Sequence, residues 1–239
     1  MHIDLENLFI LSPKHTAIVK EVENYFRDEF SKIKFEEVLF PKIMSKKMSS
    51  ELKKLSPRLT EEWDKELAYL CLHKNEKFED TGYRFCHWQC EPFYFYLQSL
   101  PSLYNIRFFD CSGWSFRYEE VDEYYRPRLF LRFEATWCST IKSDDLISQI
   151  LKIVEIFLTH KKMSFRTIQK YDEIANSGEK NVIDIEVETS SGWIEVCGCH
   201  LHGRLFLDGL GVGESDYETG CMGISISRIA AIICTQMNL

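Results

Sequence analysis

Apolar residues recur at helical spacing in several stretches of the chain. After a Ser-Pro pair at 12–13, which fits an N-cap followed by the first helical position, Ile18, Val22 and Phe26 fall on one side of a predicted helix. The stretch 141–160 repeats the pattern with a broader apolar side. We expect helices over 13–33, 45–55, 60–71 and 141–160, a short one after Cys90, and one that ends the chain.

Alternation of apolar and polar residues predicts strands in much of the remaining chain. Short turns separate these runs, and the helices are grouped at the start, middle and end. This order predicts an α+β fold with a mixed or antiparallel sheet flanked by helices. Without a repeat or a linker in the sequence, we expect one domain over 1–239. We expect a strand over 35–40, three between 104 and 140, a pair at 181–189 and 193–202, one from 220, and loops over 73–82 and 210–220.

One predicted hairpin combines charges and an aromatic ring on a single surface. Arg117 and Glu119 lie two residues apart in an aromatic-rich strand, and Phe130, Arg132 and Glu134 alternate along the next strand. Alternate residues of a strand share a face, so pairing of the two strands would gather these side chains. A structural strand rarely needs that mixture, whereas a nucleotide site does. The pattern therefore favours a nucleotide site here.

Composition narrows the class of protein. The chain is 45% hydrophobic and 14% aromatic, which is typical of a globular protein with a sizeable core. A net charge of −8 argues against binding to nucleic acid through a broad basic surface. The sequence shows no signal peptide and no apolar run of bilayer length, so we expect a cytoplasmic protein without a membrane partner. The nine cysteines then favour buried thiols or metal ligands over a disulfide framework.

Three segments, in order, resemble the motifs of class II aminoacyl-tRNA synthetases. FEEVLFP at 35–41 resembles motif 1, FRYE at 116–119 with RLFLRFE at 128–134 resembles motif 2, and GCMGISISR at 220–228 resembles motif 3. The resemblance implies the antiparallel sheet of that family, flanked by helices. It also implies a homodimer formed through the motif 1 region.

Two further segments are similar to a narrower group. DIEVETSSGWIEVCGC at 184–199 resembles the seryl enzymes, and WQCEPFY at 88–94 resembles zinc-dependent archaeal-type seryl-tRNA synthetases and the truncated amino acid:carrier-protein ligases. Those enzymes hold zinc with Cys, Glu and Cys. The resemblance places the ligands at Cys90, Glu134 and Cys221. Three protein ligands leave one open position, which the α-amino group of the substrate would take.

The resemblance also implies how ATP is held. Arg117 would bind the α-phosphate and the substrate carboxylate, and Glu119 would orient the adenine. Phe130 and Arg228 would cover the two faces of the adenine, and Glu195 would help to hold magnesium. Strand alternation predicts that Glu195 shares a face with Trp193 and Cys197. Purely structural roles are the alternatives. Arg117 and Glu119 could form a surface ion pair, and Phe130 could be a core residue. Glu195 could lie on an exposed acidic strand. The family carries Gly in motif 3 where this chain has Ser225, which leaves the nucleotide geometry open.

A second ligand-rich segment competes for the metal. CGCHLHG at 197–203 offers Cys197, Cys199, His200 and His202. On a strand the two cysteines face one way and the two histidines the other, so the four are not expected to bind one ion. Cys86, next to His87, is the alternative to Cys90 as a zinc ligand.

The expected function is ATP-dependent amino-acid activation through an aminoacyl adenylate, with ATP, magnesium and zinc required. We find no segment for a tRNA-binding domain and expect no stable tRNA binding. A carrier-protein phosphopantetheine thiol is therefore the expected acceptor. The alternatives are a non-catalytic paralogue that binds an amino acid or acts as a regulatory subunit, and a minimal tRNA-charging enzyme. The sequence leaves the amino acid itself open.

Overall fold

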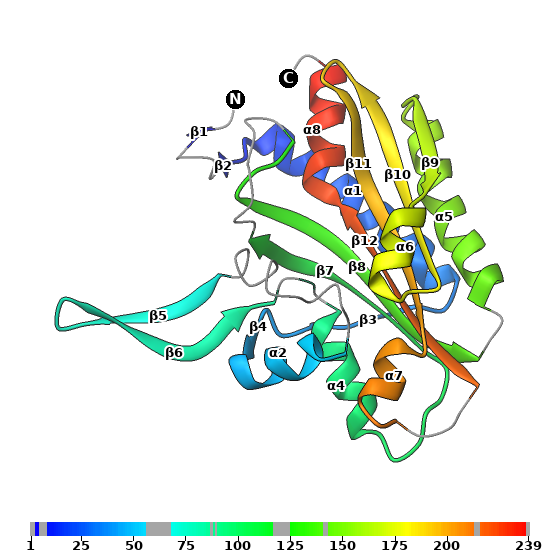
Figure 1. Cartoon of the computed structure of the whole chain (residues 1–239). Helices are drawn as coiled ribbons and strands as arrows, with labels where there is room; N and C mark the ends of the chain where they lie inside the picture. The colour runs from blue at the N-terminus through cyan, green and yellow to red at the C-terminus, as the bar shows by residue number, and fades with distance from the viewer. Residues whose placement is uncertain are drawn as a thin grey trace.

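A computed structural model gives the fold of the chain (Figure 1). The structure describes residues 3–4, 9–55, 68–86, 88, 90–116, 125–140, 143–212 and 216–237. Its elements are β1 Ile3–Asp4, β2 Phe9–Ile10, α1 Pro13–Lys32, β3 Glu36–Glu37, β4 Ile43–Ser45, α2 Lys46–Lys53, β5 Tyr69–Lys74, β6 Lys77–Phe85, α4 Glu91–Ser99, β7 Ile106–Phe116, β8 Leu129–Thr140, α5 Ser143–His160, β9 Phe165–Gln169, α6 Tyr171–Ser177, β10 Asn181–Thr189, β11 Gly192–Gly203, α7 Leu205–Gly209, β12 Tyr217–Ser225 and α8 Ile226–Gln236.

A seven-stranded sheet forms the centre of the molecule. Its strands lie in the order β3-β7-β8-β12-β11-β10-β9. The short β3 pairs with β7 in parallel, and the other neighbours are antiparallel. The α+β prediction of a mixed, largely antiparallel sheet flanked by helices is therefore confirmed.

The main hydrophobic core lies between one face of this sheet and the helices α1, α5 and α8 (Figure 1). The predicted periodicity of α1 is seen directly, because Ile18, Val22 and Phe26 are buried. Ser12 caps this helix by accepting a hydrogen bond from the backbone N–H of His15. Trp137 on β8 is fully buried in the same core. These helices cover one face of the sheet. The opposite face, called the free face below, is available for a site.

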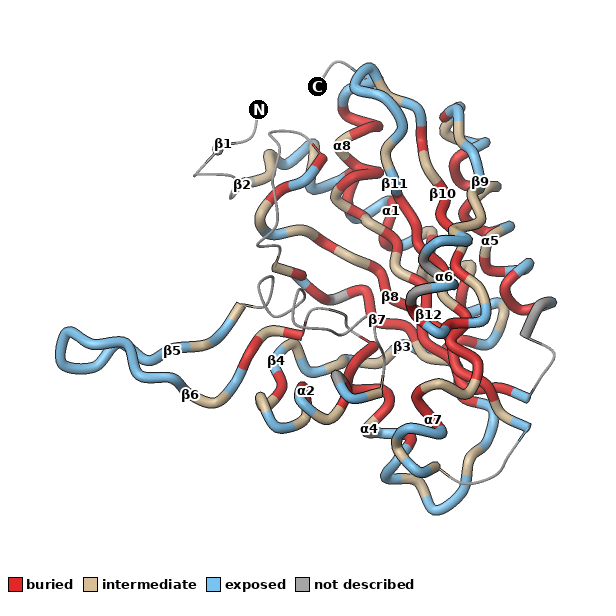
Figure 2. Tube along the Cα trace, in the orientation of Figure 1, coloured by how far each residue is buried: buried red, intermediate tan, exposed pale blue. Residues whose placement is uncertain are grey.

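A second, smaller hydrophobic cluster lies on the opposite face, under α2, α4 and α7. It contains Phe93 and Leu97 from α4 and Phe206 and Leu207 from α7. Figure 2 shows that the middle of the sheet is buried, whereas the β5–β6 hairpin is mostly exposed. The second cluster covers one end of the free face and brings the start of α4 against the sheet.

Several predicted elements differ in the structure. The expected loop at 73–82 is part of the β5–β6 hairpin, which projects from the body (Figure 1). The expected helix over 60–71 falls largely outside the described residues, and its end at Tyr69–Cys71 is strand. In the described residues between 104 and 140 the structure has two long strands where three were expected, because β7 runs without interruption to Phe116. The expected loop at 210–220 gives way to β12 at Tyr217.

The helices of the described residues are all too short or too polar to cross a membrane. The cytoplasmic location and the single domain over 1–239 stay predictions.

Candidate metal and substrate site

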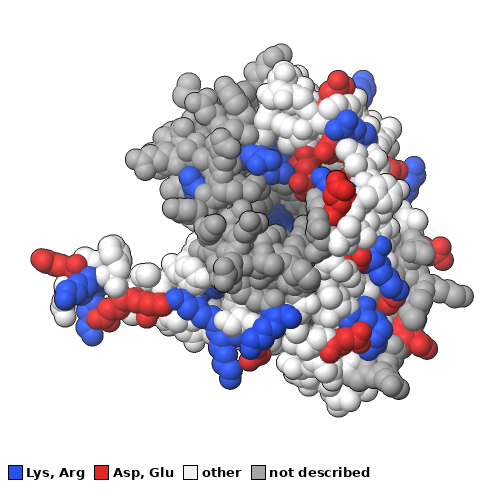
Figure 3. All heavy atoms as spheres, in the orientation of Figure 1, with Lys and Arg blue, Asp and Glu red and all other residues white. Residues whose placement is uncertain are grey.

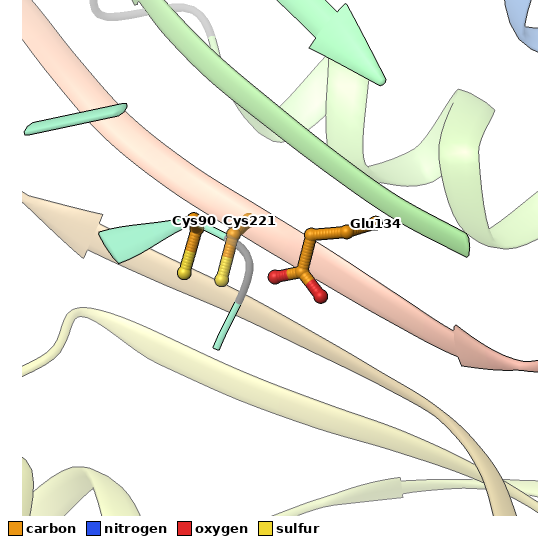
Figure 4. Close-up of side chains that lie close together, drawn as sticks. All are labelled: Cys90, Glu134 and Cys221. Carbon is orange, nitrogen blue, oxygen red and sulfur yellow. The ribbon is translucent and has the colours of Figure 1, made fainter. Parts of the chain in front are cut away.

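Cys90, Glu134 and Cys221 meet on the free face of the sheet. Cys90 precedes α4, Glu134 lies on β8 and Cys221 lies on β12. One ligand atom from each lies within 4.8 Å of the others, and all three residues are buried. Figure 4 shows the two sulfur atoms side by side, with the Glu134 carboxylate directed toward them. No other group of three or more His, Cys, Asp or Glu side chains in the described part of the chain is gathered so closely.

Glu134 is a fully buried carboxylate with one charged neighbour in contact. Arg132 Nε lies 2.7 Å from Glu134 Oε2, yet neither carboxylate oxygen accepts a well-aligned hydrogen bond from the described residues. Burial raises the pKa of Glu134, although the charge of Arg132 and a contact with the Cys90 thiol act in the other direction. A short distance without alignment makes an ion pair but not a hydrogen bond. The oxygens therefore remain suited to a cation.

The two thiols of the group are in contact with each other. A hydrogen bond to Cys221, and then burial, raise the pKa of Cys90 well above its ordinary range. For Cys221 the hydrogen bond from Cys90 lowers the pKa, but burial and the charge of Glu134 outweigh it and the pKa is raised. Both thiols therefore hold their protons at neutral pH in the absence of a cation.

A buried ion pair fixes the segment that carries Cys90. Arg84 on β6 donates from Nη1 and Nη2 to the two oxygens of Glu91, at 3.1 Å each. Its Nε also donates to Ser49 Oγ at 2.6 Å. Arg84 and Glu91 are both 3% exposed. Because Glu91 follows Cys90 directly, this pair holds the cysteine in position.

The donor set fits a zinc ion. Two thiolates and one carboxylate are ligands that zinc accepts, and three protein ligands leave a fourth tetrahedral position for a substrate. The carboxylate oxygens without aligned donors support a cation at this place. Cys86, the alternative to Cys90, instead directs its Sγ to the carbonyl of Pro41 at 3.4 Å. The role of the three residues as zinc ligands stays a prediction.

The predicted nucleotide residues fall partly outside the described chain. Arg117 and Glu119 lie outside the described residues. Phe130 is half-buried on β8, and Arg228 lies in the first turn of α8 with 5% of its surface exposed. Arg228 Nη1 donates to the carbonyl of Glu195 at 2.7 Å, and its Nε donates to the carbonyl of Tyr125 at 3.2 Å. Arg228 thus joins β11 to Tyr125, which precedes β8 in the chain.

A β-bulge decides where Glu195 points. The register between β10 and β11 shifts at Ile185 and Glu186, so Glu195 pairs with Glu186 while Cys197 pairs with Ile185. A bulge adds one residue to a strand and reverses the alternation beyond it. The expectation that Glu195 and Cys197 share a face is therefore wrong. Cys197 is fully buried in the main core, and the Glu195 side chain is half exposed on the other face.

A network of polar side chains lies beside the metal group and was not predicted from the sequence: His202, Glu179 and Tyr94 are buried, and His200 is partly exposed. His202 Nε2 lies 3.6 Å from Cys221 Sγ and 3.4 Å from Glu179 Oε1, and His202 Nδ1 forms a hydrogen bond with Tyr94 Oη at 2.9 Å. The other oxygen of Glu179 lies 3.3 Å from His200 Nδ1. The alternation of His200 and His202 signalled their common face, but Glu179 lies outside any motif. The network contacts Cys221 through His202.

The same face is open to solvent beyond Glu195. Figure 3 shows a hollow in the surface of the molecule, with acidic and basic side chains gathered beside it. A cavity of about 540 Å³ is lined by Tyr125, Arg126, Lys170, Asp184, Glu186, Ser191, Trp193, Ile194 and Glu195. Aromatic rings, two cations and three carboxylates can hold a polar ligand of nucleotide size.

Sequence similarity links the chain to a known protein family. The model of the class II tRNA synthetase core domain family (F) matches residues 99–239. The type-2 serine–tRNA ligase of Methanopyrus kandleri is 24% identical over 92% of this chain and 51% of the ligase. The ligase of the same kind from Methanothermobacter thermautotrophicus is 27% identical over 90% of this chain and 50% of the ligase. The chain spans about half the length of the curated relatives that it matches.

Solved structures agree on the fold. The M. kandleri seryl-tRNA synthetase, solved in complex with A. aeolicus tRNASec, matches with a TM-score of 0.84 and 19% identity, over 100% of this chain and 55% of that one. The Giardia lamblia prolyl-tRNA synthetase, solved in complex with prolyl-adenylate, matches with a TM-score of 0.81 and 14% identity, over 95% and 48%.

Proposed function

We infer the function from the premise that this chain belongs to the family of class II tRNA synthetase core domains. In this proposal the protein activates an amino acid with ATP and forms an aminoacyl adenylate and pyrophosphate. A carboxylate oxygen of the amino acid attacks the α-phosphorus, and the bond from that phosphorus to the bridging oxygen of pyrophosphate breaks. The observation that carries the proposal is the convergence of Cys90, Glu134 and Cys221 on one face of the sheet.

The metal group would select and orient the amino acid. A zinc ion bound there would supply one open coordination position for the neutral α-amine of the substrate. Cys90, Glu134 and Cys221 would fix that position relative to β8, which also carries Phe130. The carboxylate of the substrate would then face the nucleotide. Such orientation lowers the entropic cost of the reaction.

The remaining predicted residues would hold ATP. Phe130 and Arg228 would cover the adenine, and Arg117 with Glu119 would bind the α-phosphate and the base. Arg117 would also stabilise the charge that develops on phosphorus. Glu195, which the bulge turns to this face, would help to hold magnesium through a hard oxygen ligand. A homodimer through the motif 1 region belongs to the same proposal.

The relatives favour one acceptor for the activated amino acid. Those named above are serine–tRNA ligases, so a tRNA is the acceptor that they suggest. The expectation of no stable tRNA binding is not borne out by them. None of the relatives reported above supports the phosphopantetheine thiol of a carrier protein. We therefore place tRNA first and the carrier protein second.

Pyrophosphate exchange tests the proposal directly. The purified protein is loaded with zinc, and exchange of labelled pyrophosphate into ATP is measured with each proteinogenic amino acid and magnesium. We expect exchange with one or a few small amino acids and loss of exchange in Arg117→Ala. Absence of exchange with all of them, together with measurable binding of an amino acid, would favour the non-catalytic paralogue.

A competition experiment then identifies the acceptor. The preformed, labelled adenylate complex is offered total tRNA or a carrier protein bearing phosphopantetheine, and the label is followed to each. Transfer to tRNA that falls steeply with salt supports a tRNA-charging enzyme. Transfer to the thiol with tRNA left unlabelled supports the carrier-protein ligase.

A further inference from the structure

One buried histidine connects the segments that carry the two thiol ligands of the metal group. His202 on β11 is 4% exposed, and its two ring nitrogens face different elements. Nε2 lies 3.6 Å from Sγ of Cys221 on β12, and Nδ1 lies 2.9 Å from Oη of Tyr94 on α4. Because α4 begins directly after Cys90, one imidazole ring joins the helix that follows one thiol to the other thiol itself.

A β-bulge gives His202 this position. The register between β11 and β12 shifts between Leu201 and Gly203, which makes His202 the extra residue of the bulge. Gly203 follows with a φ of +61°, in the region that favours glycine. Bulges redirect side chains and are frequent beside functional sites. The strand therefore departs from regular pairing at the residue that contacts both Cys221 and Tyr94.

The hydrogen-bond partners assign the proton of the imidazole ring. Burial raises the pKa of the Tyr94 hydroxyl well above its ordinary value, so the hydroxyl keeps its proton at neutral pH. Among the described residues, the acceptor beside that proton is His202 Nδ1, which leaves the ring hydrogen on Nε2. Nε2 then faces two acceptors, Cys221 Sγ at 3.6 Å and Glu179 Oε1 at 3.4 Å. The ring is therefore set to offer an N–H to the Cys221 sulfur.

Further contacts hold the ring in place. Glu179 is 7% exposed and faces His202 with one carboxylate oxygen and Nδ1 of His200, at 3.3 Å, with the other. The Phe206 ring on α7 packs edge-on against the His202 ring, with ring centroids 5.0 Å apart, and stacks on Tyr94 at 4.0 Å. A buried imidazole with both nitrogens engaged has little freedom to rotate. The position of Nε2 is therefore fixed by several elements at once.

A metal-bound thiolate gains from such a donor. Zinc binds the deprotonated sulfur, and an ionised acceptor makes the stronger hydrogen bond. Contacts that orient a ligand typically contribute about 10- to 100-fold to metal affinity. In the described chain, His202 does not belong to the group of ligand atoms that lie within 4.8 Å of one another. It is therefore placed to hold a ligand and not to replace one.

We propose that His202 is a positioning residue for both thiol ligands. Its Nε2–H donates to the metal-bound sulfur of Cys221, and its Nδ1 holds α4, and with it Cys90, through the hydroxyl of Tyr94. The assignment rests on the metal site of the proposed function, but it needs neither the identity of the amino acid nor that of the acceptor. Loss of the ring should change the charge on one sulfur and the placement of both.

Cobalt(II) in place of zinc tests the hydrogen bond to Cys221. The energy of the thiolate-to-cobalt charge-transfer band depends on the charge on sulfur, which a general structural defect does not imitate. In His202→Leu we expect this band to move to lower energy, and zinc affinity, measured against a chromophoric chelator, to fall by about 10- to 100-fold. His202→Gln keeps an N–H donor and should recover part of both. An unchanged band energy in His202→Leu, at any affinity, would overturn the assignment.

Tyr94→Phe tests the link to α4 separately, because it keeps the ring that stacks on Phe206 and removes only the hydroxyl. We expect zinc affinity to fall by about tenfold, and this loss to disappear when His202→Leu is already present. Tyr96→Phe on the same helix is the matched control, since its hydroxyl contacts Tyr104 at the surface, and it should leave the affinity unchanged.

The outcomes separate this assignment from the proposals on which it rests. Additive losses in the double variant, or equal zinc affinities in Tyr94→Phe and Tyr96→Phe, would overturn the link through Tyr94. A wild type without thiolate-to-cobalt absorption would contradict the metal site, and this assignment with it. Lack of pyrophosphate exchange in a protein that shows the expected losses of affinity would contradict the proposed function alone and support the role of His202.

Discussion

Arg132 Nε lies 2.7 Å from Glu134 Oε2, and both side chains stand on the same face of β8. Glu134 is fully buried, whereas 18% of the Arg132 side chain is exposed. Burial acts to lower the pKa of Arg132, but the charge of Glu134 outweighs it and the pKa is raised. Arg132, to which the sequence assigned no role, therefore neutralises the central residue of the metal group.

Removal of this cation should destabilise the metal-free protein. Arg132→Met leaves the Glu134 carboxylate buried without its cation, and we expect the free energy of unfolding to fall by about 3 kcal/mol. Urea unfolding in the presence of a chelator measures it. Adding Glu134→Gln to the same protein should restore part of the loss, because the buried charge is gone. Strictly additive effects of the two substitutions would show that the contact contributes nothing.

Zinc content should depend on Cys90 and Cys221. Replacement of either by alanine leaves two ligands, which is too few for a stable zinc site, and the bound metal should fall from about one ion per chain to near zero after dialysis. Cys86→Ala is the matched control, since Cys86 is also buried but directs its sulfur to Pro41. Metal analysis of the purified proteins measures the difference. Full zinc retention in Cys90→Ala with loss in Cys86→Ala would reverse the assignment.

Metal binding should release protons. The pKa values of Cys90 and Cys221 are raised above the ordinary thiol value, so both thiols are protonated at pH 7 and zinc must displace their protons. We expect release of about two protons per ion, and an affinity that rises about 100-fold per pH unit. Calorimetry in buffers of different ionisation enthalpy measures the protons. An affinity independent of pH between 6 and 8 would show that the thiols are not ligands.

The Arg84–Glu91 pair should support Cys90 from a distance. Arg84→Met removes the cation that holds Glu91, next to the ligand. We expect zinc affinity to fall by about 10- to 100-fold, as for other residues that position a metal ligand. Competition with a chromophoric chelator measures it. Arg27→Met is the control, because Arg27 pairs with Glu37 away from the metal group. Equal affinities in the two variants would contradict a positioning role for Arg84.

The sequence predicted best where one periodic pattern set the structure. Residues 13–32 and 143–160 bury one side of a helix against the sheet, and their spacing alone was sufficient. The hairpin over 69–85 was missed because most of its side chains are exposed, so burial leaves no alternating pattern in it. Pairing with a neighbouring strand, which no local pattern records, makes it β structure.

The site could be predicted only in part for a related reason. Motif resemblance placed Cys90, Glu134 and Cys221 together although they are distant in sequence. The face of Glu195 was predicted wrongly because a bulge is an irregularity of pairing, which a single strand does not show. Glu179 was missed because its partner His200 lies 21 positions away across the fold. Contacts of this kind follow from sheet register, and register follows from the whole sheet.

Replacement of Arg228 should weaken the binding of ATP and leave the zinc content unchanged. Its guanidinium donates to the carbonyls of both Tyr125 and Glu195, and a lysine ammonium cannot span the two in the same way. We expect Arg228→Lys to raise the KM for ATP by about tenfold or more, because the nucleotide loses its covering guanidinium and the two segments separate. Zinc content should not change. Arg204→Lys is the control, since Arg204 pairs with Asp208 on α7. A wild-type KM for ATP in Arg228→Lys would show that the guanidinium joins the segments without serving the nucleotide.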